Sequence, residues 1–137
     1  METDHAPRSL LRQGDELDIA MEDDPGEARR VRRAVAGVLS ASDVDPNRSQ
    51  DALVAISELV SNALVHGGPP RRVHLTLRSG ALEVHVFDGS RRPPRMIEAP
   101  GPEPGGRGLH LVSRLASAWG TELGPDGKRV WCIVDLS

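Results

Sequence analysis

The stretch SELVSNALVHGG (Ser57–Gly68) decides how the rest of the chain is interpreted. Its polar residues Glu58, Asn62 and His66 follow one another at four-residue spacing, which places them on a single face of a helix. Leu, Val and Ala occupy most of the other positions, as expected for a helix that packs on a core. We therefore predict an amphipathic helix whose polar stripe faces either water or a ligand.

This helix is expected over residues 49–66, and the segment Gly67-Gly68-Pro69-Pro70 ends it. Ala55 is expected on the polar face, where its small side chain would not obstruct a ligand. The apolar face is predicted to consist of Leu53, Ile56, Val60, Ala63 and Leu64.

Length and composition narrow the class of protein. With 137 residues the chain is most simply one domain, and its net charge of −3 argues against a general nucleic-acid binder. The single cysteine, Cys132, has no partner for an internal disulfide, which fits a reducing compartment. Lys128 is the only lysine, and we attribute this to overall composition rather than function. Neither a signal peptide nor a membrane span is evident, so we expect a cytoplasmic protein.

Hydrophobic periodicity gives the order of the elements. We predict a tail over residues 1–14, followed by one domain over residues 15–137. Within it we expect strand 16–21, helix 24–39, helix 49–66, hairpin 71–88, a proline-rich loop 89–107, helix 108–119 and hairpin 121–136. This order predicts a two-layer α/β sandwich in which helices cover one face of the sheet.

Two local patterns fix details of this prediction. Asp24 and Glu27 have the spacing of a capping box at the start of the first helix. Ser79-Gly80 forms a two-residue turn in the central hairpin, and His74 then lies opposite His85 on the face away from the leucines. The inward pairs of this register are Leu77 with Leu82, Leu75 with Val84, and Val73 with Val86. We expect the two histidines to face solvent or an interface, since two ligands alone make a poor zinc site.

Three features together favour a phosphate-binding site. The amide oxygen of Asn62 can hold a hard cation such as magnesium, and the Glu58 carboxylate, one turn away, can accept a proton from an attacking hydroxyl. Asp88 follows an apolar strand and begins the long loop. The glycines of Gly105–Gly108 leave backbone N–H groups open where the next helix begins, which suits a phosphate. Each feature alone is common on protein surfaces, and the combination is more specific.

The motifs SELVSNALVHG, VFDGS, GGRGLHLV and DGKRVWCIV, in this order, resemble a known family. The chain is similar to the small actinobacterial-type members of the anti-sigma factor serine/threonine kinase family, within the GHKL superfamily of ATPases. The resemblance covers the chain from about residue 16 to its end. It implies a Bergerat-type fold with a mixed, mostly antiparallel sheet and an ATP lid over residues 89–107.

The resemblance also implies roles for individual residues. Glu58 would be the general base, Asn62 would coordinate Mg²⁺, and Asp88 would hydrogen-bond the adenine amino group. The other residues implied to bind ATP are His66, Ser90, Gly106, Arg107, Gly108 and Leu109. Ser90 stands where many GHKL proteins carry glycine, which bears on the geometry of the lid. Arg107 would touch a phosphate oxygen or lie exposed in the lid.

The implied function is that of an ATP-dependent regulator. It would phosphorylate a serine or threonine of an anti-sigma antagonist protein and control a sigma factor by partner switching. Members of the resembled family often pair through this domain, so the resemblance also implies a homodimer. The alternative is a protein-binding module that ATP gates without phosphotransfer. The arginine run Arg29-Arg30-x-Arg32-Arg33 is either a solvated helix face or a contact for an acidic partner. We expect no direct binding of nucleic acid or membrane.

Overall fold

The computed structural model of the protein describes residues 16–24, 26–92 and 108–137. The predicted tail, residues 1–14, and most of the predicted lid lie outside the described residues. The described elements, in chain order, are β1 (Glu16–Met21), α1 (Glu27–Ala41), α2 (Pro46–His66), β2 (Arg71–Arg78), β3 (Ala81–Asp88), α3 (Gly108–Leu115), β4 (Ala118–Leu123) and β5 (Lys128–Asp135).

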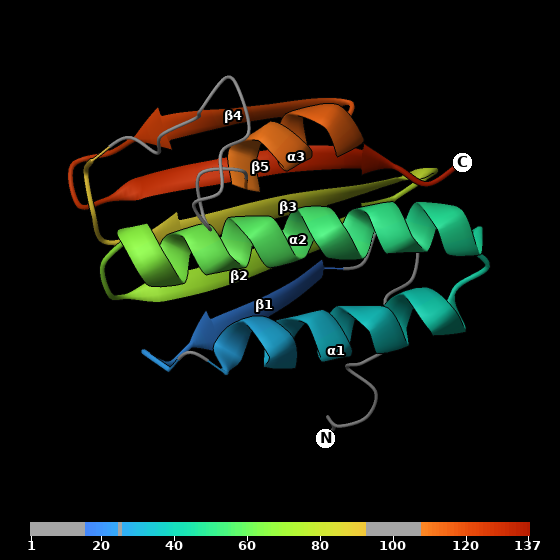
Figure 1. The fold of residues 1–137 in the computed structure, drawn as a ribbon, viewed down its shortest axis with the longest axis horizontal. Helices are drawn as coiled ribbons and strands as arrows, with labels where there is room; N and C mark the ends of the chain where they lie inside the picture. The colour runs from blue at the N-terminus through green and yellow to red at the C-terminus, as the bar shows by residue number, and fades with distance from the viewer. Residues whose placement is uncertain (1–15, 25, 93–107) are drawn as a thin grey trace.

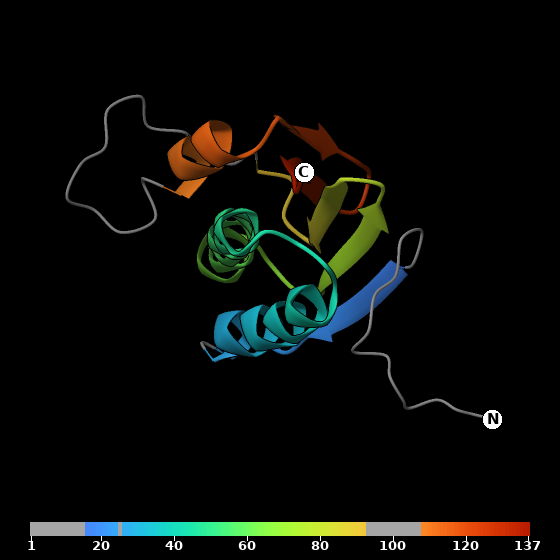
Figure 2. The ribbon, with the colours of Figure 1, turned by 90° about the vertical axis from the view of Figure 1, so that its right-hand side faces the viewer.

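The strands form one sheet, and the helices cover one of its faces (Figures 1 and 2). The strand order is β1-β2-β3-β5-β4. The predicted two-layer sandwich is confirmed, and every pairing between the described strands is antiparallel, so the sheet is more regular than the mixed one expected. Among the described residues, no helix has both the length and the apolar character of a membrane span.

The second helix begins three residues earlier than predicted, because the turn before it supplies a cap. The Asp45 carboxylate accepts a hydrogen bond from the Asn47 backbone N–H at 2.9 Å, and Pro46 occupies the first helical turn. Both features favour a helix start, since the first N–H groups of a helix have no partner within it.

The predicted capping box of the first helix is wrong. Asp24 accepts from the Gly26 N–H at 2.8 Å, whereas Glu27 turns away from the helix start and accepts from the Glu22 N–H at 2.6 Å and from Arg30. Glu27 is buried, and the hydrogen bonds from Arg30 and then from Glu22 lower the pKa of its carboxyl. The residue therefore ties α1 to the end of β1 rather than capping its own helix.

The central hairpin has the predicted register. Val73 pairs with Val86, and His74 pairs with His85, with their ring centroids 6.4 Å apart. Gly80 adopts a φ of 74°, which the two-residue turn requires and which glycine tolerates best. His74 lies within 3.0 Å of Glu16 and 3.1 Å of Asp18, both of which extend from β1.

The third helix ends at Leu115, four residues before the predicted end. Ala118 and Trp119 belong instead to β4, where Trp119 pairs with Cys132 of β5. On the opposite face, Trp131 packs so closely on Gly120 that a β-carbon there would lie 2.9 Å from its ring. The apolar residues that suggested a longer helix therefore belong to an edge strand of the sheet.

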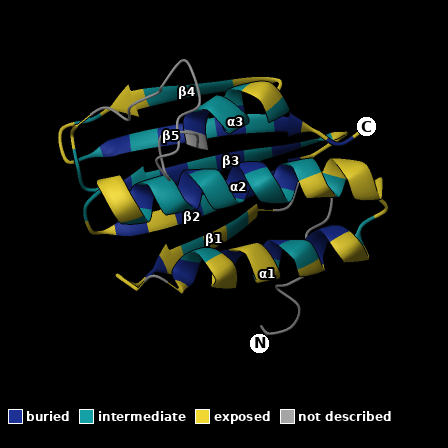
Figure 3. Ribbon diagram, in the orientation of Figure 1, coloured by how far each residue is buried: buried dark blue, intermediate teal, exposed yellow. Residues whose placement is uncertain are grey.

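The core lies between the helices and the sheet (Figure 3). Its largest fully buried side chains include Leu39, Ile56, Leu59, Leu75 and Leu109. Cys132 is a fully buried core residue, and burial raises the pKa of its thiol to about 12. This thiol is therefore protonated and poorly reactive at neutral pH.

Candidate nucleotide site

Helix α2 carries the polar stripe and lies in the middle of the helical layer, between α1 and α3 (Figures 1 and 2). Its packing surface is broader than predicted, because neighbours cover it on both sides. Ala55, expected on the open polar face, is fully buried, and so is Leu59. Glu58 and Asn62 flank these two residues and are half-buried. The stripe thus borders the core instead of standing free in water.

The environment of Glu58 suits a proton acceptor. Burial raises the pKa of its carboxyl above the ordinary 4.5. Within the described part of the chain, its carboxylate has neither a hydrogen-bond donor nor a cation as partner. A carboxylate that is partly desolvated and unpaired holds a proton more strongly than one in water, which improves it as a general base.

Asn62 and His66 follow Glu58 on successive turns of α2. Asn62 is half-buried, whereas His66, at the helix end, is exposed. The amide of Asn62 offers an uncharged oxygen, the kind of ligand that Mg²⁺ takes while keeping several waters and phosphate oxygens. The donor chemistry of Asn62 therefore fits magnesium.

Asp88 ends β3 and lies directly against the end of α2. A β-carbon on Gly67 would lie 2.5 Å from the carboxyl carbon of Asp88 and 2.6 Å from its Oδ2. The Gly89 N–H also donates to the Gly68 carbonyl at 2.6 Å, which joins the two loops. The end of the strand and the end of the polar helix thus meet, so that Asp88, Asn62 and Glu58 belong to one region of the molecule.

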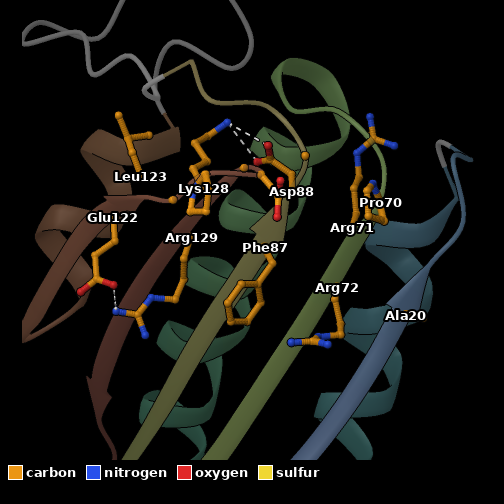
Figure 4. Close-up of a pocket in the computed structure, with 15 residues that line it drawn as sticks. Ala20, Pro70, Arg71, Arg72, Phe87, Asp88, Glu122, Leu123, Lys128 and Arg129 are labelled. Atoms are coloured by element: carbon orange, nitrogen blue, oxygen red, sulfur yellow. Dashed lines mark hydrogen bonds and ion pairs between the residues drawn. The ribbon is translucent and has the colours of Figure 1, made fainter.

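Lys128 holds the Asp88 carboxylate. Its Nζ lies 3.1 Å from Oδ1 and 3.0 Å from Oδ2, and the two side chains are only 2% and 1% exposed (Figure 4). The backbone N–H of Ser90 donates to Oδ1 at 2.8 Å, while the Ser90 hydroxyl accepts from the Arg92 N–H at 3.1 Å. Ser90, predicted to contact the cofactor, therefore also fixes Asp88 from the loop side.

The start of α3 is the helix end that the sequence predicts to bind phosphate. The helix begins at Gly108, and Leu109 is 2% exposed, so its side chain anchors the helix start in the core. Gly106 and Arg107 lie outside the described residues. His110, in the same turn, has a buried Nδ1 without a hydrogen-bond partner in the described structure. Such an orphaned ring nitrogen beside a helix start is available to a ligand or a water.

A hollow of about 810 Å³ lies at the same end of the sheet but on its uncovered face (Figure 4). Arg72, Phe87, Glu122 and Arg129 project into it, and Arg72 stacks over Phe87 with 4.9 Å between the guanidinium carbon and the ring centre. The helices lie behind the sheet in this view, and neither Glu58 nor Asn62 lines the hollow. Asp88, Gly89 and Lys128 do line it, so the hollow adjoins the predicted nucleotide site at the end of β3.

Sequence reasoning missed two residues that shape this site. It attributes Lys128 to composition and interprets Gly67 only as a helix stop. The antiparallel pairing of β3 with β5 places Lys128 opposite Asp88, and this pairing between the two hairpins has no local signal in the sequence. Glycine is required at position 67 because the Asp88 carboxyl group approaches it closely. This contact joins segments that are distant in sequence, so it could not be predicted from the local pattern.

Comparisons with known proteins bear on the fold and on the family of the chain. No curated protein matches the chain. The crystal structure of the RsbU and RsbW domains of Rv1364c from Mycobacterium tuberculosis has a TM-score of 0.69 at 23% identity, covering 89% of this chain and 32% of that one. The histidine kinase domain of the blue-light activated histidine kinase of Erythrobacter litoralis EL346 has a TM-score of 0.51 at 20% identity, covering 81% and 60%.

At these identities the solved structures show the shared fold, and this chain spans about a third and three fifths of their lengths. The family itself is shown by a sequence model. The model for the histidine kinase-like ATPase domain matches residues 21–134. The chain belongs to the histidine kinase-like ATPase domain family.

Proposed function

We propose that the chain binds ATP with magnesium and transfers the γ-phosphoryl group to a serine or threonine of an anti-sigma antagonist protein, thereby controlling a sigma factor. Membership of an ATPase-domain family supports the nucleotide. The observation that carries the proposal is the close approach of Asp88 to Gly67. It joins the end of β3 to the helix that bears Glu58 and Asn62.

Each residue then has one task in holding Mg-ATP. Asp88 accepts a hydrogen bond from the adenine amino group, and Asn62 supplies an oxygen to the magnesium ion. The backbone N–H groups at the start of α3, from Gly108 and Leu109, face the phosphates, where a helix N-terminus favours negative charge. Gly106 and Arg107 complete this end of the proposed site, and His66 and Ser90 border it. Magnesium, when bound, would neutralise phosphate charge.

The proposed chemistry is a proton abstraction coupled to phosphoryl transfer. Glu58 takes the proton of the substrate hydroxyl while the hydroxyl oxygen bonds to the γ-phosphorus. The bond from the γ-phosphorus to the bridging oxygen breaks, and ADP leaves with that electron pair. Burial raises the pKa of Glu58, which brings it closer to that of an effective base at neutral pH.

The regulatory consequence follows from charge. A phosphoryl group adds about −1.5 to −2 charges at neutral pH and would weaken docking of the antagonist by repulsion or desolvation. The domain would then be free to hold a sigma factor. The sigma-factor part of the proposal is supported by the sequence motifs and by fold similarity to a structure that contains an RsbW domain. Pairing of two copies stays a prediction.

The first test is calorimetric titration with ATP and magnesium. The wild-type protein should bind, and Asn62→Ala should bind at least about tenfold more weakly, because a ligand to the metal is lost. Asn47→Ala is the matched control, since Asn47 is an exposed asparagine in the first turn of the same helix. Absence of ATP binding by the wild-type protein would contradict the proposed function.

A second test separates a kinase from an ATP-gated binding module. In a phosphotransfer assay with candidate antagonist proteins, Glu58→Gln should lose about 10²-fold or more in rate while it still binds ATP. The exposed Glu22→Gln serves as the control. If the wild-type protein binds ATP and regulates its partner, but neither transfers phosphate nor responds to Glu58→Gln, the binding-module alternative is correct.

A further inference from the structure

The buried pair of Asp88 and Lys128 occupies the same end of the sheet as the proposed nucleotide site. The two residues are direct neighbours in the register of β3 and β5. Both side chains turn toward the helical layer, because Phe87 and Arg129, the adjacent residues, project from the uncovered face (Figure 4). The alternation of the strands therefore directs the pair toward the side of the sheet that carries Glu58 and Asn62, and at the end of the sheet both residues also line the hollow.

The identity of the cation is informative. The chain has 17 lysines and arginines, and Lys128 is the only lysine, so the other 16 are arginines. The Asp88 group that Lys128 binds is closely enclosed. A β-carbon on Gly67 would lie 2.6 Å from Oδ2 of Asp88, and one on Gly127 would lie 2.1 Å from the Asp88 carbonyl oxygen. A compact ammonium suits such a space better than the planar, five-donor guanidinium.

The hydrogen bonds within the pair leave acceptor positions on Asp88 and donors on Lys128 unused. Oδ1 of Asp88 accepts from the Ser90 N–H and from Lys128, whereas Oδ2 accepts from Lys128 alone among the described residues. An ionised carboxylate has about four acceptor positions, and an ammonium has three donors. In the described structure the ammonium has no other acceptor than Asp88. An acceptor and a donor with spare capacity thus lie side by side, 3.0 Å apart.

We propose that Lys128 is an adenine-binding residue, which donates to ring N1 while Asp88 accepts from the neighbouring 6-amino group. This inference rests on the proposed binding of ATP and adds the donor that recognises N1. Adenine presents a donor at position 6 and an acceptor at position 1, the complement of the carboxylate and the ammonium. Guanine presents an acceptor at position 6 and a donor at position 1, so its order is reversed.

Lys128 also keeps Asp88 suited to this contact. A carboxyl group buried without a positive charge tends to retain its proton. A protonated carboxyl group would present an O–H to the adenine amino group, and two donors would then face each other. The ammonium thus compensates the charge that Asp88 needs in order to accept a hydrogen bond.

The test compares ATP with 1-deaza-ATP, in which a C–H replaces ring N1 and the amino group remains. Calorimetry on the wild-type protein should show at least about tenfold weaker binding of 1-deaza-ATP, as expected when a hydrogen bond to a charged group is lost. Lys128→Met should bind ATP more weakly and should bind the two nucleotides equally. If Lys128 served only in folding, the substitution would weaken the binding of both nucleotides and leave the ratio of the two affinities unchanged.

Arg129→Met is the matched control. Arg129 follows Lys128 on β5 and pairs with Glu122 at 2.6 Å on the uncovered face, so its loss should leave the ratio of the two affinities unchanged. A wild-type protein that binds ATP and 1-deaza-ATP equally would overturn the inference and leave the proposed function intact. So would a Lys128→Met variant that keeps the wild-type ratio. A wild-type protein that binds neither nucleotide would overturn both.

A measurement on the wild-type protein covers the case in which Lys128→Met does not fold. Because Lys128 is the only lysine, protein labelled with ¹⁵N at the lysine side chain gives one ammonium signal. That signal should shift on addition of ATP with magnesium and should respond differently to 1-deaza-ATP. Identical shifts with the two nucleotides would contradict a contact to N1.

Discussion

The two ends of strand β3 each carry an ion pair, and the pairs differ in burial rather than in distance. Near the start of β3, Glu83 pairs with Arg78 of β2 at 2.8 Å, with side chains 22% and 60% exposed. At the end of β3, Asp88 pairs with Lys128 of β5 at 3.0 Å, with side chains 1% and 2% exposed. The chemistry is the same, one carboxylate and one cation on adjacent strands.

This comparison teaches that geometry alone does not give the energetic role of an ion pair. At the surface, water screens the attraction, and either partner can be solvated when the other is removed. In the buried pair, each charge depends on the other, because removal of one leaves an uncompensated charge in a medium of low dielectric constant. The exposed pair is therefore dispensable, whereas the buried pair constrains both the fold and the site beside it.

The largest effect is expected from breaking the buried pair. Lys128→Met should lower the free energy of unfolding by about 3–5 kcal/mol, because Asp88 is left buried without its counter-charge. Urea denaturation measures this change. The double variant Lys128→Met with Asp88→Asn should recover part of the loss, since no buried charge remains. A loss below about 1 kcal/mol in the single variant would show that Asp88 is solvated.

A second prediction tests the contact between Asp88 and the end of α2. Gly67→Ala should destabilise the protein by about 1–3 kcal/mol, because its β-carbon would overlap the Asp88 carboxyl group at 2.5 Å. Gly67 has a φ of −91°, so backbone strain is not the cause. It should also weaken ATP binding, since Asp88 must move.

Gly37→Ala is the matched control for this substitution. Gly37 lies in α1, and a β-carbon on it would have no neighbouring atom within 4 Å, so alanine should stabilise the helix by about 0.5–1 kcal/mol. Thermal unfolding of both variants gives the comparison. If Gly67→Ala were as stable as Gly37→Ala, Asp88 would not be confined at the end of α2.

Much of this fold could be predicted from the sequence, because its elements have clear local signals. The alternation in β2 and β3 and the Ser79-Gly80 turn predict the register of the hairpin correctly. The helix predicted to reach residue 119 is wrong, since Ala118 and Trp119 are apolar in either structure and only the pairing with β5 decides between them. Local periodicity does not contain that pairing.

The candidate site was less predictable than the fold. Motif order indicated the family, which is confirmed at the level of the histidine kinase-like ATPase domain. The roles assigned to Glu58, Asn62 and Asp88 stay predictions. The burial of Ala55 and the pairing of Asp88 with Lys128 depend on how α3 and β5 pack, and these segments are distant in sequence. Such contacts arise from tertiary structure, which spacing within one helix does not reveal.

A third and smaller effect concerns Glu58, a carboxylate that burial disfavours without a partner to compensate it. Its pKa in the folded protein is raised above 4.5, so the folded state binds this proton more tightly than the unfolded state. As pH rises from the pKa of the unfolded state through the higher pKa of the folded state, the carboxyl group therefore makes the protein less stable. Glu58→Gln should raise Tm at about pH 7 and change it less at about pH 4, with Glu22→Gln as control. A lower Tm at neutral pH would indicate a stabilising partner.

The smallest effect is expected at the exposed end of β3. Arg78→Gln should lower the free energy of unfolding by only about 0.2–1 kcal/mol, because the Arg78 side chain is 60% exposed and Glu83 remains accessible to water when the arginine is lost. The difference should shrink further in about 1 M salt, because salt weakens ion pairs that are open to solvent. Urea denaturation at low and high salt measures both quantities, and Lys128→Met provides the contrast because salt should change its loss little. If Arg78→Gln were as damaging as Lys128→Met, burial would not be what separates the two ends of the strand.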